Sequence, residues 1–237
     1  MKEFVLDLHT HTIASGHAYG TIREMAQAAA ERGLQVLGLT EHGPGLPDAC
    51  HPIYFLNLKV IPRELYGVKL LFGCEMNVLP EGRLDLEPPY IDKLDYGIVG
   101  IHNPCYHDQG PVKNTDNLIA CMAHPKVRFV SHPDDSRLPV DYPALVQAAK
   151  DLNVALEVNN TSLTPGCFRQ GARENYHAML PLCQELGVPI VVNTDAHDPS
   201  AVGLMPYARA LLEELRFPEE LVLNTDVEKA LAFLNRH

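Results

Sequence analysis

FVLDLHTHT, residues 4–12, places two histidines, two positions apart, at the end of a short apolar run. A β-strand turns successive side chains to opposite faces, so a strand here predicts Asp7, His9 and His11 on one face and the leucines on the other. Two imidazole rings would then converge where a buried strand ends. The alternative for an isolated His-x-His is a pair of surface histidines, and the rest of the chain decides between the two interpretations.

Six further apolar runs share this form, and most of them also end in polar residues. The seven runs occupy residues 4–11, 36–43, 69–78, 96–103, 127–133, 154–160 and 189–197. Near-continuous apolar runs without alternation are typical of parallel strands that are covered on both faces. The pattern therefore predicts a parallel sheet.

Helical patterns separate many of the runs. Residues 21–33 begin with Thr21 as an N-cap and Glu24 three positions later, which is the signature of a capping box. Residues 140–153 and 174–187 repeat the amphipathic pattern, the second with an internal proline. The connections between the second and third runs and after residue 103 are richer in Pro and Gly, which predicts loops with short helices.

The alternation of strands and helices predicts the α/β class. Seven strand–helix units in a chain of 237 residues favour closure into a distorted seven-stranded (βα)7 TIM-like barrel over an open sheet. No linker with a change of composition interrupts the series, so we expect a single domain over residues 1–237. The tail from residue 199 to 237 is expected to form two helices that close the structure.

Composition narrows the functional classes. Hydrophobic residues make up 46% of the chain, enough for a core, and the net charge is −11 with scattered Lys and Arg, which disfavours binding to long nucleic acids or anionic membranes. The apolar runs are too short to span a membrane, and no signal peptide precedes the first run. The six cysteines form no Cys-x-x-Cys pair, so we expect reduced thiols in a cytoplasmic protein. The oligomeric state is open.

Side chains able to bind metals gather at the C-terminal ends of the runs, which form one face of a βα barrel. They are His9, His11, His42, Glu75, His102, His132, Asp195 and His197, with His17 in the loop after the first run. Any one of them alone could be a hydrogen-bonded residue at a loop entry. Together, seven imidazoles on one face require a cation, because their protonated forms repel one another. The remaining histidines, at positions 51, 107, 124, 177 and 237, are expected in loops or at the surface.

Imidazole and carboxylate ligands without thiolate suit Zn²⁺, Mn²⁺ or Fe²⁺ in an open catalytic site better than in a closed structural site. Nine ligands exceed the needs of one ion, so we expect two or three metals. Glu75 is the candidate bridge between two of them, because a carboxylate has two oxygens whereas a neutral imidazole has one free lone pair. The alternative is that Glu75 binds one ion or pairs with a nearby cation.

Six motifs, DLHTHT, LTEHG, CEMNV, GIHNP, SHPDD and NTDAH, together resemble those of the PHP (polymerase and histidinol phosphatase) superfamily, and in particular its YcdX-like phosphatases. The resemblance runs from Val5 to about Gly203. It implies a distorted seven-stranded barrel with a trinuclear centre, usually of zinc and sometimes of manganese or iron.

The resemblance also implies how the ligands are shared. The first ion would be held by His9, His11, Glu75 and Asp195, the second by Glu75, His102 and His132, and the third by His17, His42 and His197. Residues 159–176 resemble the family segment that supplies an arginine near the bound anion, which would fall on Arg169. Arg173 is the alternative, and a further one is that both arginines are solvated.

Hydrolysis of a phosphate ester is slow because its anionic centre repels hydroxide and the leaving oxygen gathers charge. Divalent ions lower the pKa of bound water toward about 7 and supply local positive charge in an acidic protein. We therefore predict a metal-dependent phosphatase that hydrolyses small phosphomonoesters through metal-bound hydroxide, with Asp7 as a candidate to orient a ligand imidazole and no dedicated side-chain acid. The alternatives are a nuclease or nucleotide phosphodiesterase, a histidinol phosphatase, or a non-catalytic metal-binding regulatory protein.

Overall fold

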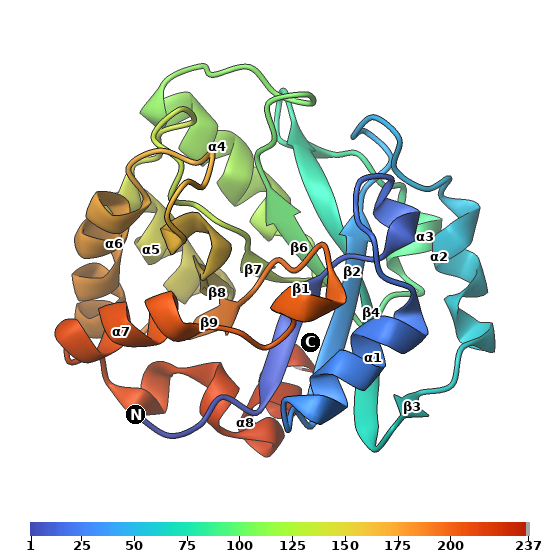
Figure 1. Ribbon diagram of the computed structural model, residues 1–237. Helices are drawn as coiled ribbons and strands as arrows, with labels where there is room; N and C mark the ends of the chain where they lie inside the picture. Colours follow the sequence, from blue (N-terminus) through green and yellow to red (C-terminus); the bar gives the residue numbers. More distant parts are fainter. Residues whose placement is uncertain (236–237) are drawn as a thin grey trace.

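The computed structural model describes residues 1–235, and within them seven parallel strands follow one another in the order β1-β2-β4-β6-β7-β8-β9 (Figure 1). Their bounds are β1 (Leu6–Thr10), β2 (Val36–His42), β4 (Val68–Leu79), β6 (Tyr96–Gly100), β7 (Val127–Val130), β8 (Ala155–Asn159) and β9 (Ile190–Asn193). Each coincides with one of the predicted apolar runs. Two short strands, β3 (Glu64–Leu65) and β5 (Arg83–Leu84), pair antiparallel with β4. The predicted α/β barrel is confirmed.

Helices cover the outside of the barrel. They are α1 (Ile22–Glu31), α2 (Ile53–Asn57), α3 (Pro88–Ile91), α4 (Pro111–Met122), α5 (Tyr142–Leu152), α6 (Ala172–Leu186), α7 (Pro206–Glu214) and α8 (Val227–Leu234). The predicted capping box of Thr21 and Glu24 begins α1. The prediction of short helices after residue 103 is wrong, because α4 has 12 residues. Pro111 stands at the start of α4, where a proline favours a helix.

The C-terminal segment contributes α7 and α8, which confirms the two predicted helices as far as the described residues extend; His237, expected at the surface or in a loop, lies outside them. Phe233 and Leu234 of α8 share one apolar cluster with Leu6, Tyr96 and Phe129 of the strands. The barrel interior is therefore a packed core, and the chemistry is left to the opposite end. No helix within residues 1–235 has both the length and the apolar character needed to cross a bilayer.

The seam between β1 and β9 is closed at several points, and between its two ends Leu8 N donates to Asn193 Oδ1 at 2.8 Å. At the C-terminal end of the strands, Asp195 N donates to His9 O and His11 N donates to Ala196 O, both at 2.9 Å. At the other end, the buried Asn224 side chain accepts from Val192 N at 2.6 Å and donates to Leu6 O at 2.9 Å. The Asn224 side chain thus takes the place of backbone hydrogen bonds that would otherwise join the two strands directly.

We expect Asn224→Leu to lower the free energy of unfolding by about 2–4 kcal/mol, because it leaves backbone groups of Leu6 and Val192 buried without partners. Urea unfolding followed by circular dichroism measures the change. Asn57→Leu, at an exposed position, is the matched control, with an expected change within about 0.5 kcal/mol. A loss no larger than the control's would show that Asn224 does not hold the seam.

The alternation predicted for the first strand is wrong at Asp7. The pairing of β1 with β2 passes from Asp7 opposite Leu37 to Thr10 opposite Leu39, so β1 carries one extra residue. An inserted residue turns the following side chains to the other face. Asp7 consequently accepts hydrogen bonds from Thr194 and Gly203, away from the imidazoles that follow it.

Candidate metal centre

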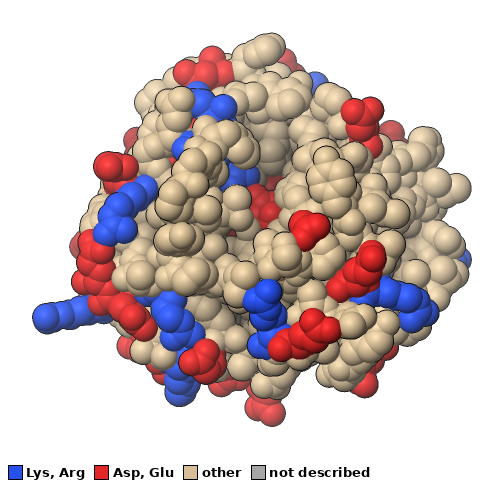
Figure 2. All heavy atoms as spheres, viewed as in Figure 1, with Lys and Arg blue, Asp and Glu red and all other residues tan. Residues whose placement is uncertain are grey.

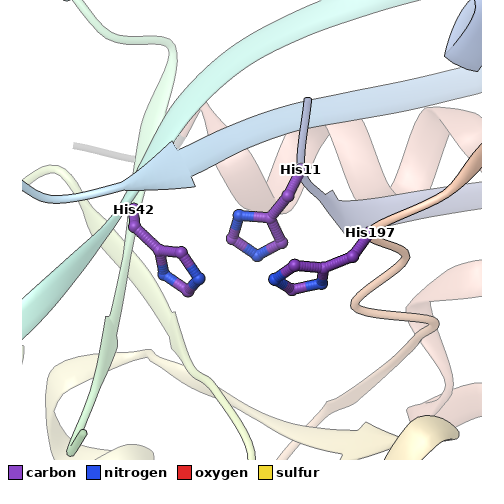
Figure 3. A group of neighbouring side chains, drawn as sticks. All are labelled: His11, His42 and His197. Atoms are coloured by element: carbon purple, nitrogen blue, oxygen red, sulfur yellow. The ribbon is translucent and has the colours of Figure 1, made fainter. Parts of the chain in front are cut away.

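The nine predicted metal-binding side chains meet at the C-terminal end of the barrel. Figure 3 shows His11 from the end of β1, His42 from the end of β2 and His197 from the loop after β9 with their rings turned toward one another. Three groups have ligand atoms that all lie within 4.8 Å of one another: His11, His42 and His197; His9, His11, Glu75 and Asp195; and His42, Glu75 and His102. The groups share members, so they form one continuous cluster.

Glu75 lies at the centre of this cluster. It lies within β4, where it is the register partner of His42 at the end of β2, and it is fully buried. Its Oε1 is 2.7 Å from His132 Nε2 and 3.4 Å from His102 Nε2. Its Oε2 is 2.9 Å from His42 Nδ1 and 3.3 Å from His9 Nε2. His11 Nε2 also lies 3.5 Å from Oε2. Each carboxylate oxygen therefore faces its own set of imidazoles.

His17 and His132 lie beside the three groups. His17 Nε2 is 3.2 Å from His197 Nε2, and the His17 ring stacks on His42 with centroids 4.9 Å apart. His132 reaches the cluster through Glu75. The backbone of His132 and of Asp195 has φ of 29° and 56°, in the region that favours glycine. Such conformations persist where the surrounding structure enforces them, and they concentrate at functional sites.

Several buried polar atoms of the cluster lack a hydrogen-bond partner: His42 Nδ1, Glu75 Oε2, His102 Nε2 and Asp195 Oδ1. His42 Nδ1 and Glu75 Oε2 are 2.9 Å apart without hydrogen-bond geometry. An unsatisfied buried polar atom costs about 1–3 kcal/mol. Ligand atoms around one tetrahedral zinc stand about 3.3 Å apart. Unpartnered donor atoms at such spacings fit divalent cations.

The charge states of Glu75, Asp195 and His11 suit metal binding, whereas at His9 the lowering of the pKa by burial is outweighed by Glu157 and Glu75, which raise that pKa well above its ordinary value. Burial raises the pKa of Glu75, but the neighbouring His9 and His102 outweigh it and hold that pKa well below its usual range. Burial likewise raises the pKa of Asp195, and His9 with Arg169 more than reverses the effect. Burial lowers the pKa of His11 well below its ordinary value. The carboxylates are thus ionised and His11 is neutral, which are the forms that bind metals.

Each of four histidines is oriented through its second ring nitrogen, the arrangement usual for imidazoles that bind metals. The contacts are His9 Nδ1 with Glu157 Oε1 at 2.7 Å, His11 Nδ1 with Ser15 Oγ at 3.0 Å, His102 Nδ1 with Asn77 Oδ1 at 2.7 Å, and His197 Nδ1 with Asp195 O at 2.9 Å. Glu157, and not Asp7, is therefore the carboxylate that orients the His9 ring through Nδ1. The sequence reasoning missed Glu157, although a charged residue inside an apolar run was a signal.

Glu41 anchors the loop between β1 and α1. Its buried carboxylate accepts from Thr12 N at 2.9 Å, Thr12 Oγ1 at 2.6 Å and Ser15 Oγ at 2.7 Å. Because Ser15 in turn contacts His11, Glu41 fixes the position of that ring. The same loop also carries His17.

Comparison with models of known protein families matches the PHP domain to residues 7–184. The chain belongs to the PHP family. A Clostridium novyi protein named "Probable phosphatase" is 40% identical over 233 residues, covering 98% of this chain and 95% of its own length. A second "Probable phosphatase", from Caldanaerobacter subterraneus subsp. tengcongensis, is 41% identical over 232 residues, covering 97% of this chain and 91% of its own.

Solved structures share the PHP fold. Histidinol phosphate phosphatase from Lactococcus lactis subsp. lactis, crystallised with zinc, L-histidinol and phosphate, superposes with a TM-score of 0.60 at 17% identity. The match covers 91% of this chain and 95% of the other. At this identity the likeness supports the barrel alone.

In this PHP protein the metal-binding cluster borders a cavity of about 760 Å³. Figure 2 shows a hollow in the face viewed, with acidic atoms at its depth and basic atoms on its rim. Cluster residues such as His42 and Asp195 line the cavity together with the apolar side chains of Leu46, Ile101 and Leu138. A concave space with polar groups at one end and apolar walls suits a small organic molecule.

The two candidate arginines of the PHP chain occupy different surroundings. Arg169 lines the cavity with its side chain 7% exposed, and it donates to Asp195 Oδ2 at 2.9 Å and to Ser162 Oγ at 3.2 Å. Arg173 pairs with Glu214 on α7 and its side chain is 53% exposed, outside this cavity. Of the two, Arg169 is the one placed beside the cluster.

Proposed function

We propose that this PHP chain, acting as one domain over residues 1–237, is a metal-dependent phosphatase that hydrolyses small phosphomonoesters at a centre of three divalent ions. The observation that carries the proposal is the cluster of buried imidazole and carboxylate atoms without partners beside a cavity that also contains an arginine. The full-length relatives that are named as phosphatases support the same reaction class.

The proposed ligand sets are those that the family resemblance implies. They are His9, His11, Glu75 and Asp195 for the first ion; Glu75, His102 and His132 for the second; and His17, His42 and His197 for the third. The first set is also one of the three groups whose ligand atoms lie within 4.8 Å of one another. His42, which is assigned to the third ion, also approaches Glu75, which is a proposed ligand of the second ion. Zinc is the first choice because imidazole and carboxylate donors suit it, with manganese and iron as the alternatives.

Divalent ions held here would polarise phosphoryl oxygens and generate the nucleophile from water near neutral pH. Arg169 would donate to the phosphoryl oxygens, because its guanidinium is fixed by Asp195 and Ser162 at the edge of the cavity. Burial by itself lowers the pKa of Arg169, but the nearby Asp195 and Asp134 raise it above its ordinary value. The positive charge is therefore permanent.

Besides the proposed metal ligand Asp195, two carboxylates border the cavity, Asp135 and Asp198, and neither is suited to protonate the leaving group. Burial raises the pKa of Asp135, but the hydrogen bonds from Arg137 outweigh burial, so that the pKa lies below its ordinary value. The Ser200 hydroxyl lowers the pKa of Asp198. Both carboxyls are ionised at neutral pH, which supports departure of the leaving group without a proton from a side chain.

Purified protein from metal-replete growth is expected to contain about three transition-metal ions per chain and to hydrolyse p-nitrophenyl phosphate. Treatment with a chelator should lower turnover at least about 100-fold, and Zn²⁺ or Mn²⁺ added singly should restore it. Elemental analysis and a colorimetric assay measure the two quantities, with histidinol phosphate and a dinucleotide tested beside the aryl ester. Turnover that persists in metal-free protein, or inactivity toward every phosphoester, would contradict the proposal.

A further inference from the structure

Arg137, which the sequence reasoning did not single out, borders the same cavity from the loop after β7. Its Nε lies 3.0 Å from both oxygens of Asp135, and its Nη2 lies 2.5 Å from Asp135 Oδ2. The backbone N–H groups of Arg137 and Gln170 hold that carboxylate in turn. The plane of the guanidinium is therefore fixed by a braced carboxylate.

One end of this guanidinium is unused by the protein. Within residues 1–235, Nη1 of Arg137 donates no hydrogen bond, and the side chain keeps 32% of its surface exposed. Arg169 differs, because both of its terminal nitrogens are engaged, by Ser162 and by Asp195. A fixed guanidinium with free donors on a cavity wall is suited to bind an anionic oxygen.

Phe168 connects the two arginines. The Cζ atoms of Arg137 and Arg169 each lie 5.2 Å from the centre of the Phe168 ring. The two guanidinium carbons are therefore no farther apart than twice that distance. Arg169 contacts the metal-binding cluster through Asp195, whereas Arg137 contacts none of the nine cluster residues by hydrogen bond or ion pair within the described chain. The cavity thus contains a second cationic group, which is not bonded to any of the cluster residues.

The size of the cavity indicates what fills the remaining space. A volume of about 760 Å³ is in the range of pockets for whole organic ligands and far exceeds one phosphate group. Leu46, Ile101 and Leu138 supply apolar wall for a carbon skeleton. Asp198 also borders the cavity, and its negative charge disfavours an anion there. Away from the cluster, the Arg137 side of the wall is the favourable place for a second anionic group.

We propose that Arg137 determines substrate specificity by binding a second anionic group, a carboxylate or phosphate, carried by the leaving group of the phosphomonoester. The proposal rests on the phosphatase function proposed above and names its substrate class. Asp135 offsets much of the charge of Arg137, so selectivity arises from directed hydrogen bonds more than from long-range attraction.

The test compares matched substrates in wild type and Arg137→Gln. The pairs are phenyl phosphate with 4-carboxyphenyl phosphate, and propyl phosphate with 1,3-propanediol bisphosphate. We expect the wild type to favour the member with two separate anionic groups in at least one pair by about 10-fold in kcat/KM, mainly through a lower KM. In Arg137→Gln, the ratio of the two kcat/KM values should fall close to one. Arg23→Gln, an exposed arginine on α1, is the matched control and should keep the wild-type ratio.

The outcomes separate this proposal from the one on which it rests. If phenyl phosphate is hydrolysed but neither pair is discriminated, or if Arg137→Gln keeps the discrimination, the specificity role is wrong while the phosphatase function stands. A merely structural role of Arg137 would lower both members of a pair equally and leave their ratio unchanged, which also overturns the proposal. Inactivity of the wild type toward all four compounds in the presence of Zn²⁺ or Mn²⁺ counts against the phosphatase function itself.

Discussion

Replacement of Glu75 by alanine is expected to abolish phosphoester hydrolysis and to remove two metal ions together. The two oxygens of Glu75 face separate sets of imidazoles, with His132 and His102 nearest Oε1 and His42 and His9 nearest Oε2. A carboxylate in that position can serve two cations, so its loss weakens both sites and removes a negative charge that all of these imidazoles share. The loss of activity should exceed about 1,000-fold.

Elemental analysis and anomalous scattering from crystals of Glu75→Ala measure which sites are emptied, and circular dichroism checks that the barrel is folded. His17→Ala should disturb chiefly the third ion, because His17 reaches the cluster through His197 and His42. His177→Ala is the neutral control, since His177 is partly exposed and pairs with Glu214. If Glu75→Ala emptied a single site, Glu75 would not be the bridge.

Arg169→Ala is expected to lower kcat/KM by about 100- to 1,000-fold while the metal content stays at the wild-type level. The guanidinium lies in the cavity with a fixed positive charge, held by Asp195 and Ser162, and its remaining N–H groups can donate to a phosphoryl group. Arg169→Lys should recover little of the loss, because an ammonium group cannot reproduce the planar fork.

Steady-state kinetics combined with elemental analysis tests this role. Arg173→Ala is the matched control, because Arg173 pairs with Glu214 outside the cavity, and its kinetics should match wild type. Unchanged kinetics in Arg169→Ala would contradict the phosphate contact. A parallel loss of metal would show that Arg169 serves to hold the Asp195 carboxylate.

Much of the fold could be predicted from local patterns. The apolar runs are long enough to identify each main strand, and the capping box identified the start of α1. The nine cluster residues could be predicted to meet, because parallel strands of a barrel end on one face. The length of α4 was not predicted, because the Pro and Gly residues after residue 103 indicated loops with short helices, whereas Pro111 stands where a helix begins.

The partners of the cluster could not be predicted in the same way. Glu157 contacts His9 across 148 positions of sequence, and Asn77 contacts His102 across 25. Such pairs depend on which strands are neighbours and on how their registers align. The charge of Glu157 inside an apolar run indicated a buried role, but no neighbouring residue in the sequence indicated which side chain it contacts.

The sequence by itself determined the strands, the barrel and the set of side chains at its C-terminal end, because periodicity and residue type are local properties. Only the tertiary structure decided which way those side chains turn. The extra residue of β1 between Asp7 and Thr10 sends Asp7 to Thr194 and directs His9 toward Glu157. Strand register and side-chain pairing arise from contacts between distant segments, and a one-residue shift in register reverses the face that every later side chain occupies.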